Sequence, residues 1–184
     1  MTMFDVMLNL CIGIVGGIFS SIIVSRIFLI NSTFTEQIAR VQEHFEKSYV
    51  LGGLIGSYSI YVKREDLPDD TTVERINRDL LKEIHIICKN ELDSFNAMIF
   101  DDLEDNLHSL AVELNDIICE LSGLKVIDKE TMISFGARLL SVQNKFNAYK
   151  KLSPKIFRKQ LWKDKCLRIL MVIFIIVIVG TIIA

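Results

Sequence analysis

An arginine and a histidine lie seven residues apart in the segment Arg78-Asp79-Leu80-Leu81-Lys82-Glu83-Ile84-His85. Residues seven apart on a helix share one face, here roughly opposite the apolar stripe that contains Leu80. Arg78 and His85 therefore share a face, and their placement would suit a cleft formed across a dimer. It equally suits a solvated surface on which Glu74 and Arg78 form an i,i+4 ion pair.

Other chemical motifs are absent from the sequence. There is no Walker A loop, no nucleophile elbow and no HExxH pattern. Three widely spaced histidines do not combine with cysteines into a zinc-binding pattern, and His44 and His108 are expected at a surface or interface. The cysteines have no CxxC spacing and suit free thiols in a reducing cytoplasm; they are Cys11, Cys88, Cys119 and Cys166. The sequence thus predicts no metal, no cofactor and no enzyme activity from a standard motif.

The elements that would position these residues begin and end with strongly apolar segments. Residues 6–25 and 169–184 carry no charged side chain. A helix needs about 20 residues to cross a bilayer, so the second segment spans only if Arg168 reaches back to the interface. A cleaved signal peptide is disfavoured because the first residues contain Asp5 and no basic residue, and the apolar run is too long. Two transmembrane helices are predicted, at 6–30 and 169–184.

The basic residues that flank these segments predict an orientation. Arg26 follows the first segment, and eight cations precede the second: Lys150, Lys151, Lys155, Arg158, Lys159, Lys163, Lys165 and Arg168. All of them lie on the side of the central region, so the positive-inside rule places that region in the cytoplasm. Both termini would then lie outside, and the expected location is a bacterial inner (plasma) membrane.

The central region, 31–152, is predicted to be an antiparallel four-helix bundle. Capping boxes at Thr33 and Thr71 predict the first two helix starts, and further starts are expected at Asp101 and near Asp128. Chain breaks are expected at 67–70 and at Gly123. The expected core positions recur every three or four residues; they are Phe34, Ile38, Val41, Phe45 and Ser48 or Tyr49, then Val73, Ile76, Leu80, Ile84, Ile87, Leu92 and Phe95, then Leu103, Leu107, Leu110, Leu114, Ile117 and Leu121, and finally Met132, Phe135, Leu139, Val142, Phe146 and Tyr149.

A basic helix is predicted at 153–168, starting at Ser153-Pro154. Residues 31–149 hold 12 basic and 21 acidic side chains, whereas 150–168 hold 8 basic and one acidic. The segment is interpreted as a membrane-surface collar in which aromatic and basic side chains meet anionic lipid. The collar residues are Lys155, Arg158, Lys159, Trp162, Lys163, Lys165 and Arg168. A topology signal alone remains the alternative, and nucleic acid is not an expected partner because the bundle is acidic.

Small residues recur at four-residue spacing in two places. Gly13, Gly17 and Ser21 fall on one face of the first span, where small residues allow close helix contact in lipid. This face could pack against the chain's own second span or against another subunit. Gly52 and Gly56 lie in an uncharged segment too short to span, and they predict close helix packing within the bundle or between subunits.

The order of a short span, an acidic helical domain, a basic aromatic collar and a second span resembles small two-transmembrane effectors of bacterial anti-phage systems, including membrane-anchored HEPN-like accessory proteins of CRISPR loci. The pair Arg78 and His85 also resembles the active-site motif of HEPN ribonucleases, which are helical bundles working as dimers. The resemblance implies a membrane role in defence and, through the motif, ribonuclease activity.

Three functions are therefore expected in order. The first is a homo-oligomeric effector that assembles through its first span and its bundle and perturbs or permeabilises the membrane. The second is a membrane-anchored scaffold whose acidic bundle recruits a basic cytosolic protein. The third is a HEPN-like ribonuclease held at the membrane. Membrane lipid and further copies of the chain are the expected partners, and no small-molecule substrate is evident.

Overall fold

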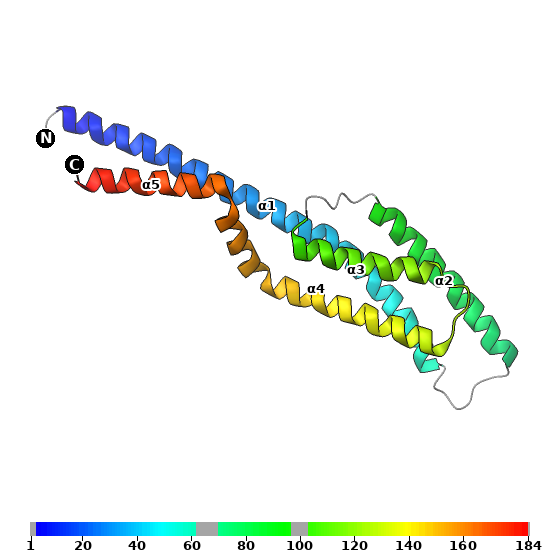
Figure 1. The fold of residues 1–184 in the computed structure, drawn as a ribbon. Coiled ribbons are helices and arrows are strands. Elements are labelled where there is room, and N and C mark those ends of the chain that lie inside the picture. Colours follow the sequence, from blue (N-terminus) through cyan, green and yellow to red (C-terminus); the bar gives the residue numbers. More distant parts are fainter. Residues whose placement is uncertain (1–2, 62–69, 97–102, 184) are drawn as a thin grey trace. The chain divides into compact units, whose positions relative to one another are not determined.

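The computed structural model describes residues 3–61, 70–96 and 103–183, and within these ranges every regular element is a helix. The helices are α1 (Met3–Tyr61), α2 (Asp70–Asn96), α3 (Asp105–Ser122), α4 (Lys129–Lys163) and α5 (Lys165–Ile183). The all-α prediction is confirmed (Figure 1). The chain divides into two compact units, one made of the residues up to Glu36 together with those from Leu152 onward, the other of Gln37–Lys151.

The predicted helix start at Thr33 is wrong, because α1 runs unbroken from Met3 to Tyr61. Thr33 is an exposed residue inside this helix. No glycine or proline occurs from Arg26 to Glu36, so nothing interrupts the backbone hydrogen bonds there. A capping box stabilises a helix end only where backbone donors are left without partners, and in mid-helix these donors are already satisfied.

The other helix ends follow the sequence more closely. Helix α2 begins one residue before Thr71. Helix α3 begins at Asp105, four residues later than predicted, and Asp101 lies outside the described residues. The Glu104 carboxylate caps this helix by accepting hydrogen bonds from the backbone N–H groups of Asn106 and Leu107. Gly123 ends it, as predicted, and Asp128 caps α4 by accepting from the Thr131 N–H at 2.8 Å.

The core of the Gln37–Lys151 unit is a helical bundle formed by the second half of α1, by α2 and α3, and by most of α4. All six predicted core residues of α4 are buried, as are the predicted positions of α3 from Leu107 to Leu121. Phe45 of α1 and Phe146 of α4 stack with ring centroids 4.2 Å apart. Ser48 is buried, whereas Tyr49, the other candidate at that turn, is 45% exposed.

In α2 the buried stripe differs from the predicted one. Of the predicted positions whose burial the structure describes, only Ile84 is buried, and the stripe continues through Cys88 and Glu91. These three residues follow a spacing of four and three, which is typical of one helix face. The prediction missed Glu91 because a carboxylate is rarely buried without a partner. Leu92 and Phe95 lie outside the residues whose side chains are described.

The other unit combines the beginning of α1 with the end of α4 and with α5. The predicted helix start at Pro154 is wrong, because α4 continues through Pro154 to Lys163. A proline removes one backbone hydrogen bond, and here that loss does not end the helix. The break falls instead at Asp164, whose carboxylate accepts a hydrogen bond from the Leu167 N–H at 2.7 Å and so caps α5. The basic segment predicted as one helix at 153–168 is thus divided between α4 and α5.

Candidate membrane-contact and helix-packing site

Within the described residues one helix, α1, is long and apolar enough to cross a membrane by length and composition. Its charged residues all follow Ser25 except Asp5, so the N-terminal part is the candidate span. The coarse prediction of a membrane-spanning helix near the N-terminus is compatible with this finding. A second span and the orientation of the chain stay predictions.

A salt bridge joins α1 to the start of α5. The Arg26 guanidinium donates to Asp164 Oδ2 at 2.8 Å, while Oδ1 of the same carboxylate caps α5. The hydrogen bond from Arg26, aided by that from Leu167, lowers the pKa of Asp164. Near this salt bridge the rings of Phe34 and Phe157 stack with their centroids 6.0 Å apart, and the Leu167 side chain is buried. Asp164 is the only acidic residue in the predicted basic segment 153–168. Both of its carboxylate oxygens already accept hydrogen bonds, from Arg26 and from the Leu167 N–H.

The face of α1 that lies against the C-terminal helices is marked by its partly covered residues. From Ile12 to Ile30 the partly covered residues follow spacings of three and four; they are Ile12, Gly16, Phe19, Ile23, Arg26, Ile27 and Ile30. On α5 the corresponding stripe is Leu167, Leu170, Phe174 and Val177. Both stripes belong to the same compact unit, in which the ribbons of α1 and α5 run along each other (Figure 1).

The small residues singled out from the sequence lie on a different face. Gly13, Gly17 and Ser21 are exposed, whereas Gly16 on the stripe is partly covered. A Cβ atom added at any of these three glycines would meet no heavy atom within 4 Å, so the difference between the faces lies in their exposure. Of the two alternatives left by the sequence, contact with the chain's own C-terminal helix does not use this face. The small face is therefore open in a single chain.

All seven predicted collar residues are exposed on α4 and α5. Trp162 is the most conspicuous, with 67% of its surface accessible. In the described part of the chain no ion pair involves Lys155, Arg158, Lys159, Lys163, Lys165 or Arg168. An exposed tryptophan among exposed cations without acidic partners is the arrangement expected of a surface that meets lipid headgroups.

The glycines at 52 and 56 lie along a groove between α1 and α4 within the bundle. The groove has a volume of about 490 Å³, and its lining also includes Tyr49, Ile133, Gly136 and Leu140. A Cβ at Gly52 would lie at an ordinary distance of 3.7 Å from Gln143 Nε2, and at Gly56 it would meet nothing. The close approach occurs instead at Gly136 of α4, where a Cβ would lie 3.2 Å from Ile55 Cγ2.

This contact predicts opposite outcomes for two glycine-to-alanine substitutions. Gly53→Ala should raise the free energy of unfolding by about 1 kcal/mol, because alanine favours the helix and position 53 faces open space. Gly136→Ala should lower it by about 1 kcal/mol, because Ile55 is only 1% exposed and overpacking outweighs the helix gain. Urea unfolding of the full chain in detergent, followed by circular dichroism, measures both. Equal gains would show that Ile55 yields freely.

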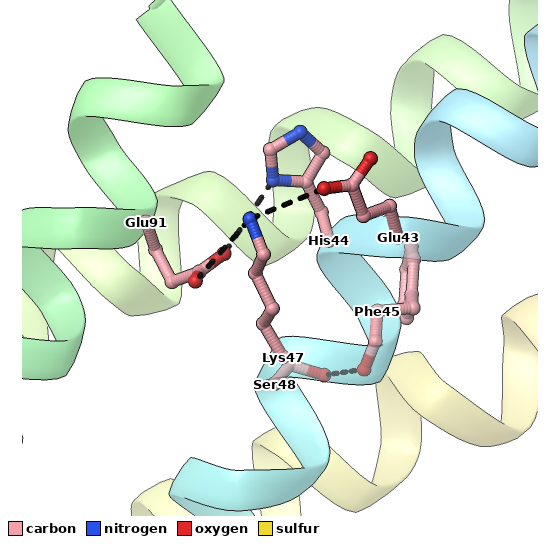
Figure 2. A network of polar contacts seen from close by, with 6 residues as sticks. All are labelled: Glu43, His44, Phe45, Lys47, Ser48 and Glu91. Atoms are coloured by element: carbon pink, nitrogen blue, oxygen red, sulfur yellow. Dashed lines mark hydrogen bonds and ion pairs between the residues drawn. The ribbon is translucent and has the colours of Figure 1, made fainter.

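A cluster of charged side chains lies between α1 and α2 (Figure 2). His44 Nδ1 is 3.5 Å from Glu91 Oε2, and the Lys47 ammonium lies 3.5 Å from Glu43 and 3.9 Å from Glu91. Both His44 and Glu91 are about 5% exposed or less. Of the two locations expected for His44, a surface or an interface, the surface is wrong, because the side chain is buried. Its position between Val41, Phe45 and Ser48 already places it on the buried stripe, a signal that the sequence contained.

Burial governs the charge of this cluster. Desolvation lowers the pKa of His44, and the nearby Lys47 lowers it further. Desolvation also raises the pKa of Glu91, an effect that Lys47 opposes. Acidification below the ordinary histidine pKa therefore destabilises the fold through His44, because the unfolded chain binds a proton there more readily than the folded one. Acidification stabilises the fold through Glu91, because the folded chain binds a proton there more readily than the unfolded one. The two contributions oppose each other in sign, and the cluster is a structural link between α1 and α2.

The candidate catalytic pair is split between two environments. Arg78 is exposed on α2, whereas His85 is partly buried and its Nε2 lies 2.9 Å from the carbonyl oxygen of Leu124. Because a carbonyl oxygen only accepts, the Nε2–H group of His85 donates this hydrogen bond to Leu124. This bond ties the ring to the segment between α3 and α4. The described residues contain no group of three or more potential metal ligands.

The positions described above define a candidate site for contact with lipid and with other helices: the open face of Gly13, Gly17 and Ser21, and the exposed collar. No protein-family model, no curated protein sequence and no solved structure matches the chain.

Proposed function

We propose that this protein is a membrane effector that self-associates through the open face of its N-terminal span and perturbs or permeabilises the membrane. The collar holds the chain at the cytoplasmic surface of a bacterial inner membrane, and the bundle supplies further contacts between subunits. The plan of the chain resembles small two-transmembrane effectors of anti-phage systems, and we propose a role in that defence.

The observation that carries this proposal is the exposure of Gly13, Gly17 and Ser21 on a face that α5 leaves uncovered. A small-residue face lets two helix backbones approach closely, which is the main source of helix association in lipid. If such a face were needed only to hold α1 against α5, it would lie on the partly covered stripe with Phe19 and Ile23. Its separate position supports a contact with a second copy.

The test compares Gly17→Leu with Gly180→Leu, because Gly180 lies in the other apolar helix and also faces open space. Each variant is expressed in bacteria at equal membrane abundance, and membrane potential is recorded after induction. Wild type and Gly180→Leu should depolarise the membrane, whereas Gly17→Leu should lose most of that effect because leucine holds the backbones apart. Light scattering of the purified proteins in detergent should show a smaller assembly for Gly17→Leu only.

Other results would favour the alternatives. Depolarisation by Gly17→Leu equal to that of wild type would contradict assembly through this face. A membrane potential unaffected by wild type, with capture of a basic cytosolic protein by the bundle, would favour the scaffold. For that scaffold, the acidic surface of α3 is partly neutralised, because Glu113 and Glu120 form ion pairs with Lys145 and Arg138 of α4. RNA cleavage lost in His85→Ala at unchanged assembly would favour the ribonuclease.

A further inference from the structure

A hollow of about 420 Å³ runs along one face of α5. Among the described residues its lining is made of two cations followed by three branched apolar residues: Lys165, Arg168, Ile169, Val172 and Ile173. The spacing of three and four residues places all five on the same side of the helix. The hollow is therefore charged at the end near the collar and apolar at the end that continues into the uncharged segment.

Among the described residues, no acidic side chain neutralises the charged end. Asp164 precedes Lys165, but its carboxylate accepts from Arg26 through Oδ2 and from the Leu167 N–H through Oδ1. Lys165 and Arg168 are exposed and form no ion pair in the part of the chain that the structure describes. Their two positive charges, one helical turn apart, are available to a single anion from outside the protein.

We propose that this hollow binds one anionic glycerophospholipid, with its phosphate between Lys165 and Arg168 and an acyl chain along Ile169, Val172 and Ile173. The two ends of the hollow select this occupant together. Free phosphate would satisfy the cations and leave the apolar end in contact with water, and an uncharged hydrocarbon would do the reverse. The three apolar side chains are 38–60% exposed. An acyl chain lying on them would cover this apolar surface and remove it from contact with water. This inference rests on the membrane location proposed above and does not require self-association.

The test measures lipid retained by the full-length protein in detergent, using native mass spectrometry after addition of phosphatidylglycerol or phosphatidylcholine. Wild type should retain phosphatidylglycerol with one lipid per chain and at least tenfold preference over phosphatidylcholine, because each cation near an anionic headgroup contributes to binding. Lys165→Gln/Arg168→Gln should lose that preference. Lys82→Gln/Lys89→Gln, which removes two exposed cations of α2 outside both the collar and the hollow, should keep it within about twofold of wild type.

A second pair of variants tests the apolar end. Val172→Trp should fill the hollow and reduce retained phosphatidylglycerol by about tenfold, whereas Met171→Trp, on a neighbouring face, should leave it unchanged. Inorganic phosphate at the same concentration should not displace the lipid. Displacement by phosphate would reduce the site to a simple anion site and overturn the proposal.

Equal losses in the two double variants would also overturn it, because they would indicate diffuse attraction between lipid and any exposed cation of the chain. The readout is independent of membrane depolarisation and of assembly size. Specific lipid retention by a chain that stays monomeric would support the lipid site while contradicting the proposed effector. Depolarisation by a chain that retains no lipid would do the opposite.

Discussion

Substituting Phe45 by alanine is expected to lower the free energy of unfolding by about 3–5 kcal/mol, the largest effect of any single change considered for the bundle. Phe45 has no exposed surface, and its ring stacks on Phe146 at 4.2 Å, nearly parallel at 8°. The substitution removes the ring's burial and leaves a cavity where α1 and α4 meet, and the surrounding helices can close it only in part. Urea unfolding of the full chain in detergent measures the loss.

Val50→Ala is the matched control, because Val50 lies on the same helix and is 56% exposed. It should change the free energy of unfolding by no more than about 0.5 kcal/mol. A similar small change for Phe45→Ala would mean that α1 and α4 do not share a packed core at this level.

The second large effect is expected at a buried hydrogen bond between the same two helices. Gln143 Nε2 donates to Ser48 Oγ at 3.0 Å, and Ser48 in turn donates to the Phe45 carbonyl oxygen at 2.7 Å. Ser48 is fully buried and Gln143 is 5% exposed. Ser48→Ala leaves the Gln143 amide without this acceptor, and an unsatisfied buried donor costs about 1–3 kcal/mol.

The double variant Ser48→Ala/Gln143→Leu separates this cost from a simple loss of packing. Replacing both partners by apolar groups removes the unsatisfied donor, so the double variant should recover most of the stability lost in Ser48→Ala. Unfolding curves for the two single variants and the double variant complete the cycle. A double variant as unstable as the sum of the singles would show that the two side chains act independently.

Sequence periodicity was sufficient to predict the bundle where one helix face is uniformly apolar. The stripe from Met132 to Tyr149 and that from Leu107 to Leu121 are buried as predicted, because a repeat of three and four residues leaves a helix only one face to bury. The start at Thr33 could not be predicted correctly, because a capping motif inside a longer helix looks the same in sequence as one at a true end.

The candidate site was predicted unevenly for a related reason. The sequence identifies the glycines but not the side chain that approaches each one. Gly13 and Gly17 proved open, and the tight contact fell at Gly136, whose partner Ile55 lies 81 residues away in the chain. The burial of Glu91 could likewise not be predicted from the spacing of apolar residues, because it depends on contacts with His44 and Lys47 from another helix.

Each compact unit contains an exposed cysteine that can be labelled chemically. Burial raises the pKa of Cys88 to about 12, so its thiol stays protonated and unreactive at neutral pH. Cys119 in the bundle and Cys166 beside Asp164 are exposed. With Cys11, whose side chain lies outside the described residues, replaced by serine, maleimide dyes would label Cys119 and Cys166 alone. Replacing Cys166 by serine would then leave Cys119 as a reporter for folding of the bundle. Replacing Cys119 instead would leave Cys166 as a reporter for contact of the collar with lipid.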